Sequence, residues 1–346
     1  MGTLDAEMTV KTIDAHVGGQ AVRLVVAGFP SPHGKSMASK LDWLTQREDE
    51  FRRLLMLEPR GHLDLIGALF TESVAPGSHA GVLFMNHAGF SGVPGSAVMA
   101  AAAVGLTRRL VMPGGDGRTA AFDTAVGTVH AAIGDGDGAV TVTGPPAFVL
   151  MPGLSVKTGN RRVQVDIAFG GGFFALVDGE AAGVGTDQSF LPALREAGVE
   201  IAAAINDRGD VVHPADELLK GVDGVIFTAP PNDPRSDLRA ILVSSVGAVD
   251  RSAGGCAVGA LLAVLDALDL VEEGRGVHVE GLLNTVMSAR TVQRTAVGDV
   301  PALQAQVTGS AWITGEHTFL FDERDPVGPG IQLSASRIRR TAESRE

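Results

Sequence analysis

The feature that most limits how this chain can fold is a unit that occurs twice: an apolar strand, a glycine-rich loop and a long apolar helix. In the first unit, the strand at 81–85 leads through such a loop into a helix at 97–110. In the second, the strand at 240–246 leads into a helix at 257–270. Neither helix has a polar face, so each must be surrounded by protein. The pattern predicts a mixed α/β chain with two similar units that could face each other across a cleft.

The glycine-rich loops also indicate what the two units could bind. A loop that feeds a helix N-terminus exposes free N–H groups at the positive end of the helix dipole, which suits an anion such as a carboxylate. Alternatively, both loops are ordinary strand–helix turns, since glycine makes up 45 of the 346 residues. Neither loop matches G-x-x-x-x-G-K-[ST] or a clean G-x-G-x-x-G within a parallel βαβ unit, so no nucleotide cofactor is expected.

Three other segments have a readable pattern. Residues 22–27 follow a glycine turn and predict a strand, and residues 40–57 form an amphipathic, charged pattern that predicts one helix. Residues 163–177 resemble a strand, but a run of three glycines beginning at Gly170 interrupts them. Glycine inside a strand often marks a bulge or a close approach to a ligand. The charged tail at 334–346 is expected to fray.

Charge and cysteine content exclude several classes of protein. The chain has 28 Lys+Arg against 40 Asp+Glu, a net charge of −12, which argues against binding to nucleic acid or to an anionic membrane surface. Cys256 is the sole cysteine, so no disulfide framework and no multi-cysteine metal site can form. The nine histidines show no H-x-H or H-x-x-x-H spacing, so no metal site is indicated.

The N-terminus and the hydropathy pattern bear on location. The first ten residues are acidic and contain no apolar core, so no secretory signal is expected. The longest apolar run, around 98–105, is too short to span a bilayer. We therefore expect a cytoplasmic protein, and a length of 346 residues favours two domains.

Five short motifs occur in an order that is typical of one family. They are D-A-H-V-G-G-Q at 14–20, E-P-R-G-H-L-D at 58–64, F-T-A-P-P at 227–231, D-R-S at 250–252 and T-G-E-H-T-F at 314–319. In these motifs the chain resembles the proline racemase family, over about residues 10–333. That family includes proline racemase, 4-hydroxyproline epimerase and trans-3-hydroxyproline dehydratase.

The resemblance implies an α/β (α+β) fold like that of diaminopimelate epimerase. Such a fold has two pseudo-symmetric lobes, each a curved mixed sheet around a central helix, with the active site in the cleft between them. By analogy, the N-terminal lobe is expected at 8–125 plus 310–335, the C-terminal lobe at 126–309 and a flexible tail at 336–346. Family members need no cofactor, because two cysteines flank the substrate α-carbon and exchange its proton from opposite faces.

Both family cysteine positions differ in this chain. The first lies in Y-S-x-M-C-G-H-G, where the chain reads F-S-G-V-P-G-S-A, with Pro94 in place of the cysteine and Ser96 in place of the histidine. The second lies in D-R-S-P-C-G-T-G, where the chain reads D-R-S-A-G-G-C-A, with Gly254 at the cysteine position and Cys256 two residues later. Proline and glycine side chains carry no proton, so racemisation by two thiols is not expected.

The substrate-binding residues follow from the same resemblance. Ile66 and Ser244 stand where the family carries aromatic residues, which predicts a larger cavity. Asp250 matches a carboxylate that contacts the ring nitrogen of the substrate; alternatively it caps a helix N-terminus. Backbone donors survive a change of side chain, so the expected carboxylate clamp is formed by Gly95, Ser96, Ala97, Gly255, Cys256 and Ala257.

Besides Asp250, four side chains are candidates for acid–base catalysis. Cys256 lies at a helix N-terminus, which could lower its pKa, although free cysteine is more often a small buried hydrophobe. His16 has a suitable pKa range, but it could instead bond to the glycine turn that follows it. Asp64 lies in a motif that serves packing as much as chemistry, and His87 precedes the first loop and could face the cleft.

Two classes of function are compatible with these residues. The first is a cofactor-independent lyase, isomerase or C–C bond hydrolase that acts on a cyclic amino or imino acid, such as a substituted proline or pyrroline carboxylate. The second is a binding protein that keeps the clamp and has lost the bases. A lyase resembling the 3-hydroxyproline dehydratases is a further alternative. The expected partner is a small molecule, and the oligomeric state stays open, with a homodimer as one alternative.

Overall fold

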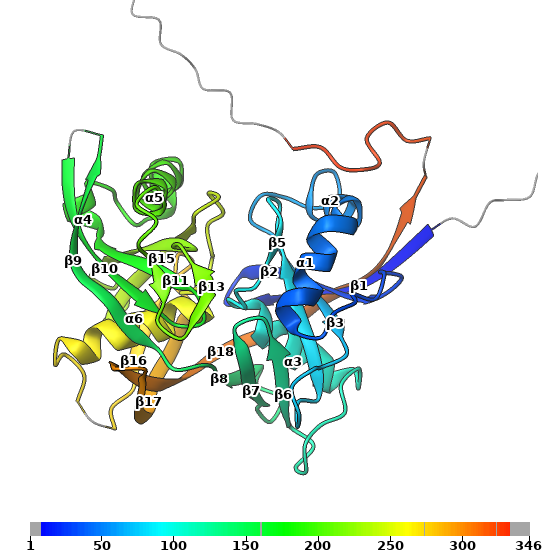
Figure 1. Cartoon of the computed structure of the whole chain (residues 1–346), viewed down its shortest axis with the longest axis horizontal. Helices are drawn as coiled ribbons and strands as arrows, with labels where there is room; N and C mark the ends of the chain where they lie inside the picture. Colours follow the sequence, from blue (N-terminus) through cyan, green and yellow to red (C-terminus); the bar gives the residue numbers. More distant parts are fainter. Residues whose placement is uncertain (1–7, 160, 273, 323, 333–346) are drawn as a thin grey trace, which may run out of the picture.

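The chain folds into two lobes that stand side by side and share one long strand, β18 (Val300–Phe321) (Figure 1). The structure is a computed structural model that describes residues 8–159, 161–272, 274–322 and 324–332.

The first lobe is built from the elements that precede residue 144. Its strands are β1 (Met8–Val17), β2 (Gln20–Ala27), β3 (Ile66–Thr71), β4 (Ala80–Met85), β5 (Phe90–Ser91), β6 (Thr119–Thr124), β7 (Gly127–Ile133) and β8 (Ala139–Thr143). Its helices are α1 (Met37–Arg47), α2 (Asp49–Met56) and α3 (Ala97–Thr107).

The second lobe is built from the elements that follow. Its strands are β9 (Phe148–Thr158), β10 (Arg161–Phe169), β11 (Phe173–Asp178), β12 (Val212–His213), β13 (Asp216–Lys220), β14 (Gly224–Ala229), β15 (Leu238–Ser244), β16 (Val277–Glu280) and β17 (Val286–Val297). Its helices are α4 (Gly179–Ala182), α5 (Leu191–Asn206) and α6 (Gly255–Ala267), with the 3₁₀ helix η1 (Gln188–Phe190) before α5.

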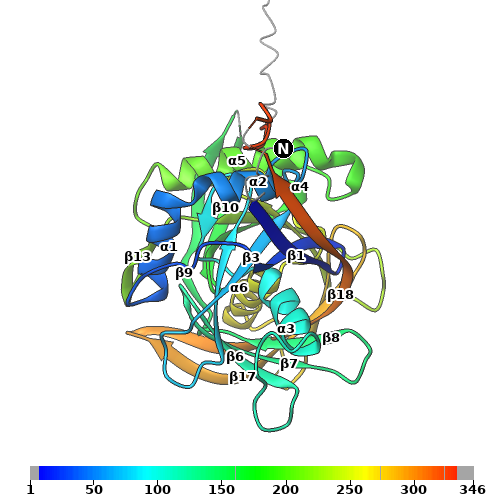
Figure 2. The ribbon, with the colours of Figure 1, turned by 90° about the vertical axis from the view of Figure 1, so that its right-hand side faces the viewer.

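One hydrogen-bonded path connects the strands of both lobes, in the order β1-β2-β3-β4-β6-β7-β8-β18-β17-β16-β15-β14-β11-β10-β9. The first part of β18 pairs with β17, its middle pairs with β8 and its last part pairs with β1. Seen from the side, the strands curve around the two central helices α3 and α6 (Figure 2). This arrangement confirms the predicted fold of two lobes, each a curved mixed sheet around a helix.

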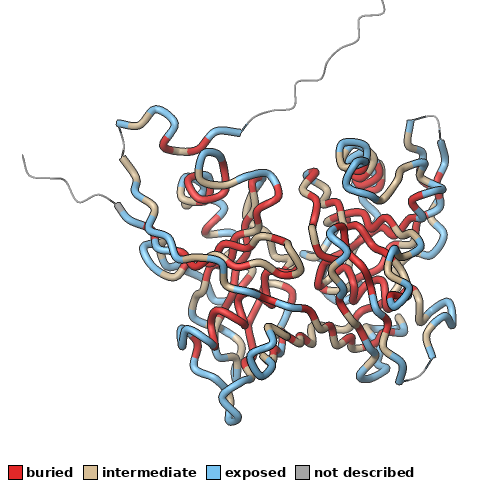
Figure 3. The backbone as a smooth tube through the Cα atoms, turned by 180° about the vertical axis from the view of Figure 1, so that it is seen from behind, coloured by how far each residue is buried: buried red, intermediate tan, exposed pale blue. Residues whose placement is uncertain are grey.

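The two apolar helices lie at the centres of the lobes, as predicted. Residues 97–106 of α3 are all buried, and α6 is buried from Ala257 to Val264. Buried residues fill the interior of both lobes (Figure 3). One apolar cluster contains both helices, so the core continues from one lobe to the other. Alanine and glycine on these helices permit this because small side chains let a strand approach closely. At Gly170 in the β10–β11 turn, a Cβ atom would collide with the backbone of α6.

The predicted single helix at 40–57 is wrong, because the segment forms two helices. Ser36 caps α1 through a reciprocal hydrogen-bonded box with Ser39, and α1 ends at Arg47, before Glu48, whose φ of −121° is not helical. The next helix begins with Asp49 and Glu50 in its first turn, where acidic side chains favour the positive end of the helix dipole. The charged pattern that suggested one long helix therefore contains a second helix start.

Strands β7 and β8 lie beyond the predicted lobe boundary at residue 125, yet both pack against α3 in the first lobe (Figure 1). β7 pairs with β6, and β8 joins β7 to the middle of β18. The run of three glycines from Gly170 forms the turn between β10 and β11, so the interruption seen in the sequence separates two strands.

Candidate active site

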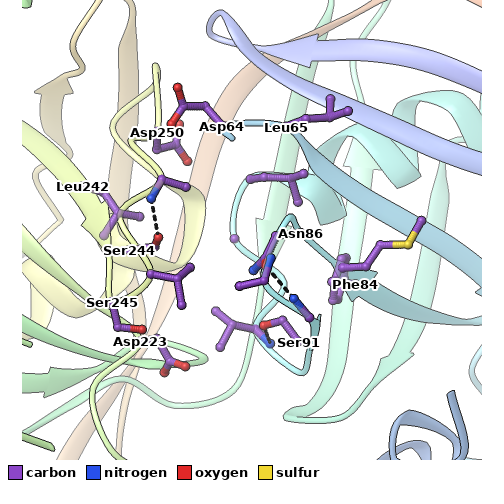
Figure 4. Close-up of a pocket in the computed structure, with 18 of the residues that line it drawn as sticks. Asp64, Leu65, Phe84, Asn86, Ser91, Asp223, Leu242, Ser244, Ser245 and Asp250 are labelled. Carbon is purple, nitrogen blue, oxygen red and sulfur yellow. Dashed lines mark hydrogen bonds between the residues drawn. The ribbon is translucent and has the colours of Figure 1, made fainter. Parts of the chain in front are cut away.

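A cavity of about 330 Å³ lies between the two lobes, in front of the helix N-termini (Figure 4). The first lobe contributes residues from β3, β4 and the loop that leads into α3. The second lobe contributes residues around the ends of β14 and β15. The lining residues are Gln20, Asp64, Leu65, Ile66, Phe84, Met85, Asn86, Ala88, Gly89, Phe90, Ser91, Val93, Pro94, Gly95, Phe174, Asp223, Leu242, Ser244, Ser245, Val246, Ala248, Val249 and Asp250.

The lining includes three carboxylates, and no lysine, arginine or histidine lines the cavity among the residues that the structure describes. Asp64 lies toward one end of the cavity, and Asp250 and Asp223 lie along the wall formed by the second lobe (Figure 4). The three groups have different surroundings, which lower the pKa of Asp64 and raise the pKa of Asp250 and of Asp223.

Asp64 is the fully paired carboxylate. Its two oxygens accept hydrogen bonds from Arg195 on α5 at 2.8 and 2.6 Å, and Arg251 lies 2.7 Å from Oδ2. The backbone N–H of Val249 also donates to Oδ1 at 2.8 Å. Burial opposes ionisation, but these hydrogen bonds outweigh it and lower the pKa of Asp64 to about 2. Because Asp64 belongs to the first lobe and its partners to the second, the group ties the lobes together.

Asp250 is buried and bonded to hydroxyl groups. Its Oδ1 accepts the N–H of Ser252 at 2.8 Å and the hydroxyl of Ser252 at 2.7 Å. Its Oδ2 accepts the hydroxyl of Ser96, from the other lobe, at 3.1 Å. Burial raises the pKa of Asp250, and the bonds from Ser252 and Ser96 counter that rise in part.

Asp223 has the fewest partners of the three. Its Oδ2 accepts the backbone N–H of Phe173 at 2.8 Å, and no described residue donates to its Oδ1. Burial raises the pKa of Asp223 to about 7, and the single Phe173 N–H counters it only in part. A carboxyl that titrates near neutral pH is suited to accept and return protons.

The helix N-termini meet, as predicted, but most of their N–H groups lie behind the cavity. Gly95 lines the cavity, while Ser96 is fully buried and its hydroxyl accepts the Gly255 N–H at 3.3 Å. One donor of the expected carboxylate clamp is thus occupied by a side chain of the protein. Five residues of the expected clamp do not line the cavity: Ser96, Ala97, Gly255, Cys256 and Ala257.

Cys256 lines a separate small cavity of about 30 Å³, next to Gly95 and Gly170. Burial raises the pKa of the Cys256 thiol to about 12, although the Gly95 backbone N–H lowers it in part. The negative charges of Asp223 and Asp250 also raise it. The thiol is therefore neutral near pH 7, and its predicted catalytic role stays a prediction.

The candidate histidines lie outside the cavity lining. His16 Nδ1 accepts the N–H of Gly19 at 3.2 Å, so the side chain bonds to the glycine turn that follows it. His87 is 4% exposed, and burial lowers its pKa, while the backbone carbonyls of Leu63 and Val246 raise it in part. These two carbonyls come from opposite lobes, so His87 lies where the lobes touch.

The predicted cavity residues Ile66 and Ser244 do line the cavity, together with Asp64, Gly95 and Asp250. The Ser244 hydroxyl accepts the Ala248 N–H at 2.9 Å, a hydrogen bond within the second lobe (Figure 4). Asp223 was not predicted. Its signal in the sequence is weak, since it is one acidic residue in front of the apolar strand β14.

The described residues hold neither a metal-binding group of side chains nor a membrane-spanning helix. No group of three or more His, Cys, Asp and Glu side chains is placed to hold a metal ion there. In the same part of the chain, no helix combines the length and the apolar character that crossing a membrane requires.

Comparison with known proteins agrees with the fold and with the motifs. The chain is 33% identical over 325 residues to a trans-3-hydroxy-L-proline dehydratase of Bacillus cereus, covering 93% of this chain and 97% of the relative. It is 33% identical over 327 residues to a 3-hydroxyproline 2-epimerase of Burkholderia multivorans, covering 93% and 98%. A crystal structure of a hydroxyproline epimerase from Agrobacterium vitis, with bound trans-4-OH-L-proline, matches with a TM-score of 0.86 and 27% identity, over 94% of this chain and 96% of that one.

The family model described as proline racemase matches residues 12–332, which include both lobes and every residue of the cavity lining. The relatives are enzymes that share almost the whole length of this chain. On this evidence the chain belongs to the proline racemase family.

Proposed function

We propose that this protein is a cofactor-independent enzyme that acts on a cyclic amino or imino acid, by lyase, isomerase or C–C bond hydrolase chemistry rather than by two-thiol racemisation. The observation that carries the proposal is the interlobe cavity, which is lined by three carboxylates and by no thiol among the described residues. Pro94 lines it at the position of the first family cysteine.

Asp250 supports a ligand with a positively charged nitrogen. An ionised carboxylate offers about four lone-pair sites, and the hydroxyl and N–H groups of Ser96 and Ser252 occupy three of those of Asp250. The remaining site can accept an ammonium or iminium N–H from the cavity. Such a contact favours the ionised form of Asp250 and so opposes the effect of burial.

The missing thiols favour a substrate that is already activated. In a pyrroline carboxylate, the C=N bond can take up the electron pair that is released when a neighbouring C–H or C–C bond breaks. One acid–base group then suffices, whereas a saturated proline needs a strong base on each face. Ile66 and Ser244 leave room for a ring substituent, because both are smaller than an aromatic residue.

The relatives favour one more specific alternative. Two of them are named for 3-hydroxyproline, and one of these is a dehydratase. Loss of water from 3-hydroxyproline would likewise need one base and would produce an unsaturated ring. A non-catalytic protein that binds the same ligands is the remaining alternative, and turnover separates it from the enzyme.

A panel of ligands tests the proposal. Binding is measured by calorimetry, and turnover by proton NMR, with L-proline, D-proline, trans-3-hydroxy-L-proline, trans-4-hydroxy-L-proline and substituted Δ1-pyrroline-2-carboxylates. We expect no racemisation of proline, and binding and turnover of at least one larger ring. Tighter binding of proline than of every larger ligand would overturn the enlarged cavity. Binding without conversion would indicate the binding protein.

A further inference from the structure

Asp223 differs from every other carboxyl of the site because it lines two cavities. Besides the main cavity it lines a second one of about 280 Å³, and Val93 is the other residue common to both. This second cavity lies between α1 of the first lobe and the β12–β13 hairpin of the second lobe, and its lining includes Leu41, Phe169 and Leu219. The Asp223 carboxyl thus stands at the partition between a ligand space and a separate opening.

The backbone holds the Asp223 side chain in place at this partition. Its Oδ2 accepts the Phe173 N–H at 2.8 Å, and its own N–H donates to the Phe173 carbonyl at 2.8 Å. Gly172 precedes Phe173, and a Cβ atom there would come within 3.0 Å of Oδ2 and 2.9 Å of Val93. The carboxyl is therefore fixed by one oxygen, while no described residue donates to the other, Oδ1.

We propose that Asp223 is a catalytic acid–base residue of the main cavity and that the second cavity is the route by which its proton exchanges with water. The assignment rests on the proposed function, because it needs a ligand with an activated C–H bond. From the N-protonated (iminium) form of the ring, Oδ1 accepts the proton of the carbon next to C=N; the C–H electron pair becomes a C=C bond, and the C=N π pair moves onto nitrogen to give the neutral enamine. The Asp223 carboxylic acid then returns the proton to another carbon of the same conjugated system or to the departing group.

The charged and titratable neighbours of Asp223 are compatible with this role. In the second cavity they are Asp42 on α1 and Asp216 and Lys220 on β13. On the side of α6, the negative charge of Asp223 helps to raise the pKa of the Cys256 thiol, which is neutral near pH 7. Burial raises the pKa of Asp223 to about 7, so at neutral pH both of its protonation states are populated.

Deuterium exchange tests the assignment. In D2O, the wild-type protein and its Asp223→Asn and Asp210→Asn variants are given the panel ligand that is turned over, and proton NMR follows both turnover and exchange. Asparagine can still accept the Phe173 N–H, so the fold should persist. We expect Asp223→Asn to lose at least about 100-fold in both rates. Asp210, which is ion-paired with Arg208 and lines neither cavity, serves as the matched control with no change.

Two other outcomes would overturn the assignment. One is an Asp223→Asn variant that retains wild-type exchange. The other is a Cys256→Ser variant that alone abolishes exchange, which would make the thiol the base. The water route has its own variant, Leu219→Trp, which fills the second cavity; we expect it to lower the deuterium content of the product at least several-fold relative to turnover. An unchanged deuterium content would overturn the route.

A measurement without ligand separates this inference from the proposed function. Carbon-13 NMR of protein labelled at the aspartate carboxyls, with the signal identified by its absence in Asp223→Asn, gives the titration of Asp223 directly. We expect a midpoint near 7, and a midpoint near the ordinary aspartate value of about 3.9 would overturn the assignment. If the carboxyl titrates near 7 but no panel ligand binds, the proposed substrate class is wrong and the acid–base group remains.

Discussion

Two aspartates at opposite ends of the same cavity have pKa shifts of opposite sign. Asp64, at the contact between the lobes, has two arginines and a backbone N–H on its oxygens, and its pKa is lowered to about 2. Asp223, on the wall of the second lobe, has one N–H, and its pKa is raised to about 7. Burial raises the pKa of both carboxyls, and the number of donors decides whether that rise persists. Asp64 therefore links the lobes as a fixed negative charge, whereas Asp223 can gain or lose a proton near neutral pH.

Removal of the Asp64 carboxylate, which links the two lobes, should have the largest effect on the free energy of unfolding. Asp64→Ala leaves Arg195 and Arg251 without their partner in a largely buried position, so we expect a loss of about 3–5 kcal/mol in the free energy of unfolding. Urea denaturation measures it. Asp64→Asn keeps an acceptor but loses the charge. Its free energy of unfolding should lie between those of Asp64→Ala and the wild type. A loss below about 1 kcal/mol would show that the arginines find other partners.

Asp223 should influence stability with the opposite sign, over the range between about pH 4 and pH 7. Its folded pKa of about 7 exceeds the unfolded value of about 3.9, so its contribution is complete below pH 4 and is lost as the pH rises through 7. Asp223→Asn avoids that loss. Between pH 5 and pH 8.5 the variant should gain about 3 kcal/mol relative to the wild type in urea denaturation. Equal pH dependence of the two proteins would remove the contrast with Asp64.

The ionised state of Asp64 predicts a smaller effect at acid pH. Its folded pKa of about 2 lies below the unfolded value of about 3.9, so its stabilisation is present above pH 4 and is lost as the pH falls toward 2. Relative to Asp64→Asn, the wild type should lose about 2 kcal/mol between pH 5 and pH 2. Thermal or urea unfolding at these two values checks the prediction, which parallel curves would contradict.

Of the three carboxyls, Asp250 should contribute least to the pH dependence of stability and most to ligand affinity. Asp250→Ala removes the proposed partner of the ligand nitrogen, so affinity for the ligand that binds wild type should fall by about 1.5–3 kcal/mol in calorimetry. The Asp210→Asn variant again supplies the control. Unchanged affinity would mean that Asp250 only holds Ser96 and Ser252 and that the nitrogen binds elsewhere.

Local patterns predicted the scaffold of this site well. The two apolar helices and the glycine-rich loops before them depend on neighbouring residues in the sequence, and both units formed as expected. Ile66, Ser244 and Asp250 could be assigned to the cavity because each lies at a fixed distance from a recognisable motif.

What could not be predicted depends on how the lobes meet. The Ser96 hydroxyl accepts the Gly255 N–H across the lobe contact, so a residue expected to donate through its backbone acts through its side chain. Asp223 precedes β14 as an ordinary polar residue, and its pKa is raised by burial that only the folded chain produces, at a position where it lines cavities together with Val93 of the first lobe. The sequence pattern of either lobe alone contains neither fact.

The strand that both lobes share has a mechanical consequence. β18 pairs with β17 over Val300–Thr308 and with β1 over Ala311–Phe321, so its two halves belong to different lobes. Unfolding of one lobe would remove the hydrogen-bonded neighbours of part of β18, a strand that also belongs to the sheet of the other lobe. It would also expose the apolar core that contains both α3 and α6. The chain should therefore unfold as one cooperative unit, without a stage in which one lobe stands intact beside a denatured one.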